Sequence, residues 1–427
     1  MKKTSGKILA TSLAALIAVP SVAAFSGCGG SPDLRVYNCY DYIDESLIEE
    51  FEDYYKEKTG KAIKVEYSCF DTPESCYNSL KINGSAYDLV CPSDYMIEKM
   101  AREDMLEEIT MPEDGAYSRN VSPFIKNKFE EISWGDKSLA NYAAGYMWGT
   151  LGLVYNTEKV NADDMKSWSY LWNDAIKGRF TIKDSVRDTY FIGLAKHYQA
   201  ELESYKSLTD LAEYAAKLKD AFNDTEEATV NAVKNDLIDL KKRSKGLEVD
   251  SGKDDIIKGN IDVYFAWSGD AVYAMSQGLY DEEGNELPAE KQVVLDYSVP
   301  EEGSNVWFDG WCVPKGAKNK DLAIEFIDFI SMPKSVIKNM EYIGYVSCIA
   351  GSDVFDWVKE TYGSENGETT DLSYFFGNGN YSVTSEDLSF FAQYPAKSVI
   401  DRCVVMNYFP DAANERITNM WIEVRVA

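Results

Sequence analysis

The sequence contains a single histidine, His197, among 427 residues, and this scarcity limits the chemistry that it can support. A Ser-His-Asp or Cys-His catalytic set requires a histidine as its base, and His197 falls within a helical pattern that is typical of a structural residue. The sequence also lacks the glycine-rich GxGxxG and P-loop segments that bind nucleotide phosphates, and calcium loops of the DxDxDG kind. We therefore expect no cofactor and no metal.

Zinc-binding patterns and long apolar segments are lacking as well. Seven cysteines follow Cys28, an odd number, and they form no CxxC or Cys/His cluster suited to zinc. Cys69 and Cys76 are near enough in sequence to form a disulfide if oxidised, whereas burial as free thiols is the commoner state of such residues. Beyond the N-terminal segment, no apolar stretch approaches the length that spans a bilayer.

Positive charge is scarce relative to negative charge. The chain has 43 Lys and Arg against 71 Asp and Glu, which gives a formal net charge of −28. Such a chain would repel nucleic acids and anionic lipid surfaces, so neither is an expected partner. The excess of acids suits a cationic ligand, although a solvated acidic surface that maintains solubility would have the same composition.

Residues 1–27 have the pattern of a signal peptide. Three lysines within the first seven residues precede an apolar run over residues 8–19, which is too short to span a membrane. The small residues before Cys28 resemble a bacterial lipobox, in which Cys28 becomes the lipidated first residue; an ordinary signal peptide with an incidental cysteine is the alternative. Residues 28–33 would form a flexible tether. The remaining 400 or so residues exceed one core, so two domains are expected.

Strand and helix patterns alternate from the start of the expected mature chain. Over residues 34–105, this βαβαβα order predicts a parallel sheet with helices on its faces. A second α/β unit begins near residue 145, and residues 352–400 have no clear periodicity. The predicted strands cover 34–38, 63–67, 87–91, 147–155, 180–182, 261–267, 292–299 and 306–313. The main predicted helices cover 73–82, 93–105, 189–199, much of 200–245, 320–331, 334–342 and 412–424.

Acidic and aromatic residues recur together where strands give way to helices or loops. An aromatic face attracts a cation and a carboxylate pairs with one, so a fold that gathers these clusters would bind a small organic ammonium ligand. Each cluster also has an ordinary interpretation, since Trp267 resembles a core residue and Asp188 and Asp270 stand where helix caps do. Carboxylate pairs would also suit a glycosidase, but nothing else favours one. The clusters are Tyr40-Asp41-Tyr42, Pro92-Ser93-Asp94-Tyr95, Trp267-Ser268-Gly269-Asp270 and Trp307-Phe308-Asp309.

In order along the chain, these clusters resemble those of bacterial polyamine-binding proteins, the spermidine/putrescine receptors of ABC importers. The resemblance begins at residues 34–42 (LRVYNCYDY) and continues at 87–95, 146–149, 184–188, 267–270, 307–309 and 343–345. It implies a two-lobed periplasmic-binding-protein fold of type II, an α/β fold in which each lobe is a mostly parallel sheet flanked by helices. The ligand would lie in the interlobe cleft. Lobe 1 would comprise residues 34–143 plus 309–350, and lobe 2 residues 144–308 plus 351–427.

Transferred residue by residue, the resemblance divides the site into acids and aromatics. It implies that Asp41, Asp188, Asp270 and Asp309 hold ammonium groups, while Tyr42, Tyr95, Trp267, Trp307 and Tyr345 surround the methylene chain and Ser93 adds a polar contact. Two departures leave the ligand open. Cys39 stands where the family usually has tryptophan, and Ser185 stands where spermidine-preferring members have an acid.

We therefore expect a monomeric substrate-binding lipoprotein of an ABC importer, which is not an enzyme. It would bind putrescine or spermidine outside the cell and deliver it to a membrane permease driven by an ATPase subunit. The closest alternative is a receptor of the same fold for an amino acid or another organic cation. An alternative of a different class is a secreted carbohydrate-active enzyme or adhesin, because aromatic platforms suit sugars too.

Overall fold

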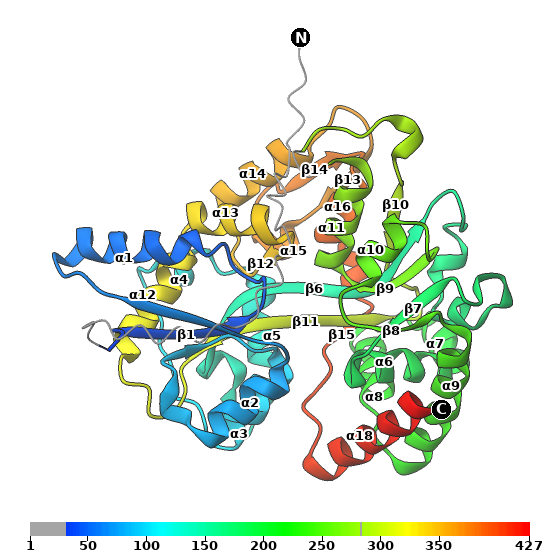
Figure 1. Cartoon of the computed structure of the whole chain (residues 1–427), viewed down its shortest axis with the longest axis horizontal. Helices are drawn as coiled ribbons and strands as arrows, with labels where there is room; N and C mark the ends of the chain where they lie inside the picture. The colour runs from blue at the N-terminus through cyan, green and yellow to red at the C-terminus, as the bar shows by residue number, and fades with distance from the viewer. Residues whose placement is uncertain (1–30, 282–283) are drawn as a thin grey trace, which may run out of the picture.

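Two long strands run through the middle of the molecule and join its two lobes (Figure 1). The computed structural model describes residues 31–281 and 284–427, so the predictions for the signal peptide and Cys28 lie outside the described residues. Strands β6 (Ala143–Asn156) and β11 (Ser304–Cys312) pair antiparallel and occupy the centre of the main sheet. All of β6 except Asn156 is buried, as expected for a strand covered on both faces.

The first lobe continues the sheet in the order β3-β1-β2 from one side of β11. Strand β1 (Leu34–Cys39) is parallel to both β2 (Val65–Phe70) and β3 (Leu89–Val90), which confirms the predicted alternation. Gly60 ends the first helix with a left-handed backbone, φ 75°. The helices of this lobe are α1 (Ser46–Thr59), α2 (Pro73–Ile82), α3 (Asp94–Arg102), α4 (Ala116–Asn120), α5 (Pro123–Glu131), α12 (Lys320–Ile330), α13 (Pro333–Ile343) and α14 (Ser352–Tyr362).

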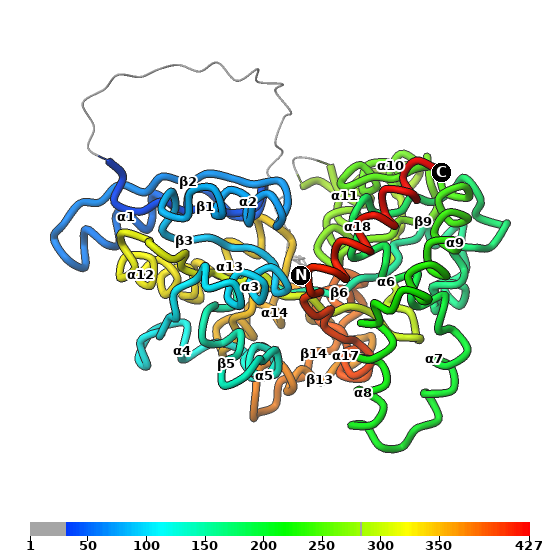
Figure 2. The backbone as a smooth tube through the Cα atoms, turned by 90° about the horizontal axis from the view of Figure 1, so that it is seen from below, coloured from blue at the N-terminus to red at the C-terminus, as the bar shows by residue number. Residues whose placement is uncertain are grey.

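The second lobe continues the sheet in the order β9-β7-β8 from the other side of β6. Strand β7 (Phe180–Lys183) is parallel to β8 (Gly246–Glu248) and to β9 (Val263–Trp267), while β10 (Leu295–Ser298) pairs with the C-terminal end of β6. Strand β12 (Val346–Ser347), which packs in the core of the first lobe, pairs with Met147 and Trp148 in the middle of β6. The helices of the second lobe are α6 (Val186–His197), α7 (Gln199–Tyr205), α8 (Leu211–Phe222), α9 (Glu227–Arg243), α10 (Gly252–Ile257), α11 (Ser268–Leu279) and α18 (Asp411–Val426). Figure 2 shows α18, coloured red, lying along this lobe beside α6 and α9.

The C-terminal segment that the sequence patterns left unassigned is divided between the lobes. Most buried apolar residues from Val354 to Ile400 join the core of the first lobe, which contains Trp148 and Phe308, although Ala392 packs among residues of β9, β10 and α11 in the second lobe. Residues from Val404 to Val424 join the core of the second lobe. The prediction assigns all of 351–427 to lobe 2, whereas the apolar packing of these residues is spread over both lobes. The segment is built of short elements rich in aromatics, which carry too little periodicity to reveal their lobe. They are β13 (Glu368–Asp371), α15 (Ser373–Phe376), β14 (Ser382–Ser385), α16 (Leu388–Gln393), α17 (Lys397–Ile400) and β15 (Cys403–Val404).

The seven cysteines of the described residues are all free thiols, including Cys69 and Cys76. Four of them, Cys76, Cys91, Cys312 and Cys348, are buried, in agreement with a packing role. Within residues 31–281 and 284–427, no helix is both long enough and apolar enough to cross a membrane.

A buried ion pair ties the sheet of the first lobe to the segment before α12. The Asp88 carboxylate is completely buried and accepts hydrogen bonds from Arg35 Nε and Nη2, both at 2.9 Å, and from the backbone N–H of Lys318 at 2.7 Å. Burial by itself would raise the pKa of Asp88, but the hydrogen bonds from Arg35 and Lys318 outweigh this effect and hold the pKa below its usual range.

We predict that Asp88→Asn destabilises the protein by about 3 kcal/mol, because it leaves the Arg35 guanidinium without its buried counter-charge. Urea unfolding of the variant and the wild type measures this difference. Asp104→Asn is the matched control, since it removes an acid that pairs with Lys315 on the surface and should change stability little. Equal stability of the Asp88 variant and the wild type would contradict the prediction.

Candidate functional site

Most of the residues that the sequence singles out lie where the two lobes meet the long central strands. Tyr42 follows β1, Ser93 and Tyr95 lie at the start of α3 after β3, and Tyr345 lies just before β12. In the second lobe, Asp188 is in the first turn of α6 after β7, and Trp267 and Asp270 lie at the junction of β9 and α11. Apart from Tyr345, these positions lie at the carboxyl ends of the parallel strands β1, β3, β7 and β9, the edge where ligands of such sheets bind.

Asp309 is a buried acid in β11, and 8% of its surface is exposed. It stands where the pairing of β11 with β6 is irregular, between Phe308 and Gly310, and it forms an isolated bridge with Ser93. The hydroxyl of Tyr42 donates to Asp309 Oδ2 at 2.6 Å. Burial raises the pKa of Asp309 to about 6, although the hydrogen bonds from Tyr42 and Ser93 lower it.

In the part of the chain that the structure describes, no basic side chain forms an ion pair with Asp309. A buried carboxylate without a counter-charge is costly, so Asp309 would bind a cation favourably.

Three aromatic rings lie edge to face beside this acid. The ring of Tyr345 lies 5.4 Å from that of Tyr42 and 5.6 Å from that of Trp307, measured between centroids. Tyr345 also donates its hydroxyl to Asp270 Oδ1 at 2.9 Å, which links the first lobe to α11 of the second. These contacts join Asp309 to Asp270 through Tyr42 and Tyr345, so the two acids belong to one connected site.

Asp270 is paired with lysines of its own lobe. Its Oδ2 atom lies 3.2 Å from Lys183 Nζ and accepts a hydrogen bond from the Tyr264 hydroxyl at 3.1 Å, and its Oδ1 atom lies 3.6 Å from Lys253 Nζ. Burial by itself would raise the pKa of Asp270, but the charges of Lys183 and Lys253 outweigh this effect and lower the pKa below its usual value, so this carboxylate is held ionised. The Lys183 ammonium also lies 4.2 Å from the centre of the Trp267 ring.

Sequence reasoning missed Lys183. The signal was its position as the last residue of a strand that is buried throughout, because a lysine there requires an acidic partner. Its side-chain partners, Tyr264 and Asp270, lie 81 and 87 positions later in the chain, so no local pattern reveals them.

Arg187, which precedes Asp188 in α6 of the second lobe, contacts Tyr95 of the first lobe. The Arg187 guanidinium lies 4.0 Å from the centre of the Tyr95 ring, and Nη2 donates to the backbone oxygens of Met406 and Asn407. Asp188 does not cap α6, because the Ser185 side chain accepts the Asp188 N–H and occupies the N-cap position. Burial raises the pKa of Asp188.

Three residues discussed above make none of the contacts that join Asp309 to Asp270. Asp41 is exposed in a left-handed turn, φ 50°, and makes no hydrogen bond or ion pair with the other described residues. Tyr40 beside it is 60% exposed, so it is not one of the buried or half-buried rings beside Asp309. His197 is exposed at the end of α6, outside the site.

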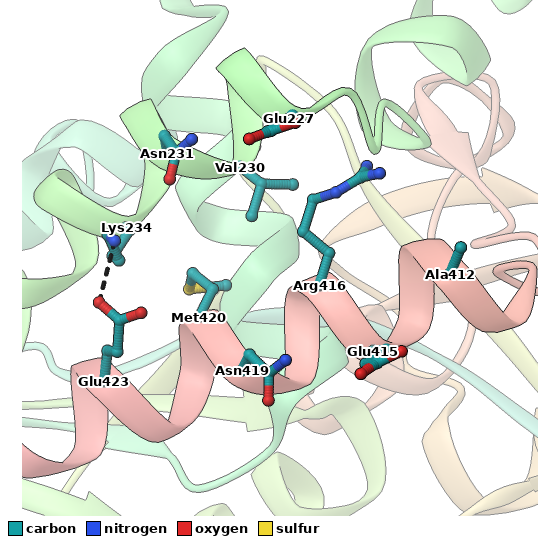
Figure 3. A pocket seen from close by; sticks show the side chains of 10 residues that line it. All are labelled: Glu227, Val230, Asn231, Lys234, Ala412, Glu415, Arg416, Asn419, Met420 and Glu423. Carbon is teal, nitrogen blue, oxygen red and sulfur yellow. Dashed lines mark hydrogen bonds and ion pairs between the residues drawn. The ribbon is translucent and has the colours of Figure 1, made fainter.

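A surface hollow between α9 and α18 is also separate from the site (Figure 3). It is crossed by an ion pair between Lys234 and Glu423 at 2.9 Å, and none of the predicted site residues lines it. Among the described residues, no group of three or more His, Cys, Asp or Glu side chains is arranged to hold a metal ion.

The family model of the bacterial extracellular solute-binding protein matches residues 47–362. The chain belongs to this family. The spermidine/putrescine-binding periplasmic protein of Escherichia coli strain K12 is 28% identical over 347 residues, covering 81% of this solute-binding protein and 84% of the relative. The putrescine-binding periplasmic protein of Pseudomonas aeruginosa is 28% identical over 344 residues, covering 78% and 82%. The resemblance to polyamine-binding proteins is therefore confirmed.

Solved structures agree with the two-lobed fold. The spermidine/putrescine ABC transporter substrate-binding protein of Streptococcus pneumoniae superposes with a TM-score of 0.62 at 25% identity, over 93% of this chain and 99% of the other. A lipoprotein of Treponema pallidum superposes with a TM-score of 0.65 at 20% identity, over 92% and 99%, which supports the fold alone.

We predict that Asp309→Asn makes the ligand-free protein more stable at pH 7, by up to about 3 kcal/mol. The folded-state pKa of Asp309, about 6, exceeds that of an unfolded aspartate, so the ionised side chain disfavours folding above pH 6. As the pH falls from 6 to 4, the wild type should regain this stability and the variant should not. Thermal unfolding at pH 7 and at pH 4.5 measures the difference. If the variant is no more stable than the wild type at pH 7, ionised Asp309 does not destabilise the folded protein. His197→Ala is the control and should behave like the wild type.

Proposed function

We propose that this chain is the substrate-binding protein of an ABC importer and that it captures a cationic amine, of the polyamine class or a related organic cation, between its lobes. The observation that carries this proposal is Asp309, a buried acid without a basic partner among the described residues, beside the rings of Tyr42, Trp307 and Tyr345. An ammonium group would supply the missing counter-charge, and the rings would cover its methylene groups.

The relatives support the class of ligand. Two of them are named for binding spermidine or putrescine, and the Streptococcus pneumoniae protein is named as a substrate-binding component of an ABC transporter. The identity of 25–28% makes amine binding a reasonable transfer, while the departures at Cys39 and Ser185 leave the preferred amine open.

Capture would proceed by closure of the lobes around the crossing strands, as in other two-lobed binding proteins. Contacts between the lobes include the bond from Tyr345 to Asp270 and the ion pair at 3.0 Å between Lys99 of α3 and Asp411 of α18. These contacts would break on opening and form again over the ligand, so closure removes water from Asp309 and strengthens its attraction for a cation.

The rest of the proposal concerns lobes, location and partners. We propose that the chain passes between the lobes in β6, in β11 and near residue 402, so that most of residues 351–400 belong to the first lobe, with α16 packed against α11 and β10 of the second. The mature protein would be a monomer without enzymatic activity. It would be attached through lipidated Cys28 to the outer face of the cytoplasmic membrane, or lie in the periplasm, and deliver its ligand to the permease and its ATPase.

We predict that amines raise the melting temperature of the purified protein by several degrees at concentrations far above Kd, because a ligand that binds only the native state stabilises it. Differential scanning fluorimetry with putrescine, spermidine, amino acids, choline-like cations and sugars measures the shift. No shift with any amine up to millimolar concentration would refute amine binding, and a shift with sugars alone would favour the carbohydrate alternative.

We also predict that Asp309→Asn weakens binding of the best amine about a hundredfold, because the ammonium then loses its buried counter-charge. Isothermal titration calorimetry measures Kd for the variant and the wild type. His197→Ala is the control and should leave Kd unchanged, since its side chain is exposed outside the site. Similar small effects of both substitutions would remove Asp309 from the ligand contacts.

A further inference from the structure

The ammonium group of Lys183 occupies an enclosed position in the second lobe. Its side chain is 1% exposed, and Nζ donates to the backbone oxygen of Val249 at 2.6 Å, to the hydroxyl of Tyr264 at 2.7 Å and to Asp270 Oδ2 at 3.2 Å. An ammonium has three N–H donors, and all three have acceptors here. Nothing in this arrangement calls for a further partner.

The groups around Lys183 are those that would hold the ammonium of a ligand. They comprise a carboxylate, a carbonyl oxygen, a phenol oxygen and the faces of two aromatic rings, with Nζ 4.2 Å from the ring centre of Trp267 and 4.8 Å from that of Tyr264. The other Asp270 oxygen is occupied by the Tyr345 hydroxyl and lies near Lys253. Asp270 therefore has no oxygen free for an incoming amine.

The charges of the site are balanced in one lobe and unbalanced at the junction. In the second lobe, the acids Asp188, Glu248 and Asp270 are accompanied by the bases Lys183, Arg187 and Lys253. In the first lobe, the neighbouring acid Asp94 accepts the backbone N–H groups of Tyr95 and Phe308, which satisfy its oxygens. Asp94 and Asp309 are both buried, and neither forms an ion pair among the described residues. Backbone N–H groups bind both oxygens of Asp94, whereas Asp309 lies beside the rings of Tyr42, Trp307 and Tyr345, so we expect an ammonium group to be held at Asp309.

We propose that Lys183 fills the cation subsite formed by Asp270 and Trp267, so that the cleft selects organic cations with one ammonium group, held at Asp309, over linear diamines. This inference rests on the proposed function and narrows its ligand. The second ammonium of a diamine would meet the Lys183 ammonium and be repelled by it, whereas a neutral polar end would not.

The test compares putrescine with N-acetylputrescine, which has the same chain but only one ammonium group. Isothermal titration calorimetry on the purified protein should give a Kd for N-acetylputrescine at least tenfold lower than that for putrescine. In Lys183→Met, the Kd for putrescine should fall at least tenfold, because Asp270 and the Trp267 face become available. Lys253→Met is the matched control. Lys253 also pairs with Asp270, so this substitution removes an equal positive charge, but its ammonium does not lie on the Trp267 ring, and the variant should show no such gain in putrescine binding.

Three results would overturn the proposal. The first is wild-type protein that binds putrescine as tightly as N-acetylputrescine, and the second is a gain for putrescine that is equal in the two lysine variants. The wild-type comparison needs no substitution, so it decides the matter even if Lys183→Met fails to fold. The third is a folded protein that binds neither amine, with or without Lys183, which would refute the proposed function itself. Equal binding of both amines would leave that function standing and remove only the role of Lys183.

Discussion

The antiparallel pairing of β6 with β11 is the constraint on which the rest of the structure depends. Strand β6 contributes residues to the cores of both lobes, whereas the buried apolar residues of β11, which pairs with it, join the cores of the first lobe. The irregular pairing at Asp309 sets an acid among buried residues at the junction, where a regular strand would have continued its alternation. The fold thus creates the site by the same strands that hold the lobes together.

The sequence predicts the parts of this structure that depend on local pattern. The alternation over residues 34–105 and the clustering of acids and rings at strand ends follow from spacing and residue type. Pairings between distant residues were out of reach, because Lys183 meets Asp270 only after the sheet has formed. Asp41 lies at a strand end, as its position in the sequence indicates, but residue spacing gives no sign of the left-handed turn that leaves its side chain exposed.

The net charge of −28 is a poor guide to where a cation would bind. In the second lobe, buried acids lie beside buried bases, so a dense group of carboxylates there attracts a cation only weakly. Asp309 is a single acid, but burial and the lack of a partner base make its charge costly in the empty protein. Local compensation, and not the number of acids, therefore determines which carboxylate is available.

Trp307 and Asp309 belong to β11, one of the strands through which the lobes are connected. Any rotation of one lobe against the other must be absorbed in β6, in β11 and in the short connection near residue 402. The torsion angles of β11 would then change together with the direction of the Asp309 carboxylate. The angle between the lobes and the shape of the site therefore change together. A ligand bound at Asp309 would restrict the twist of β11 and so the rotation of the lobes.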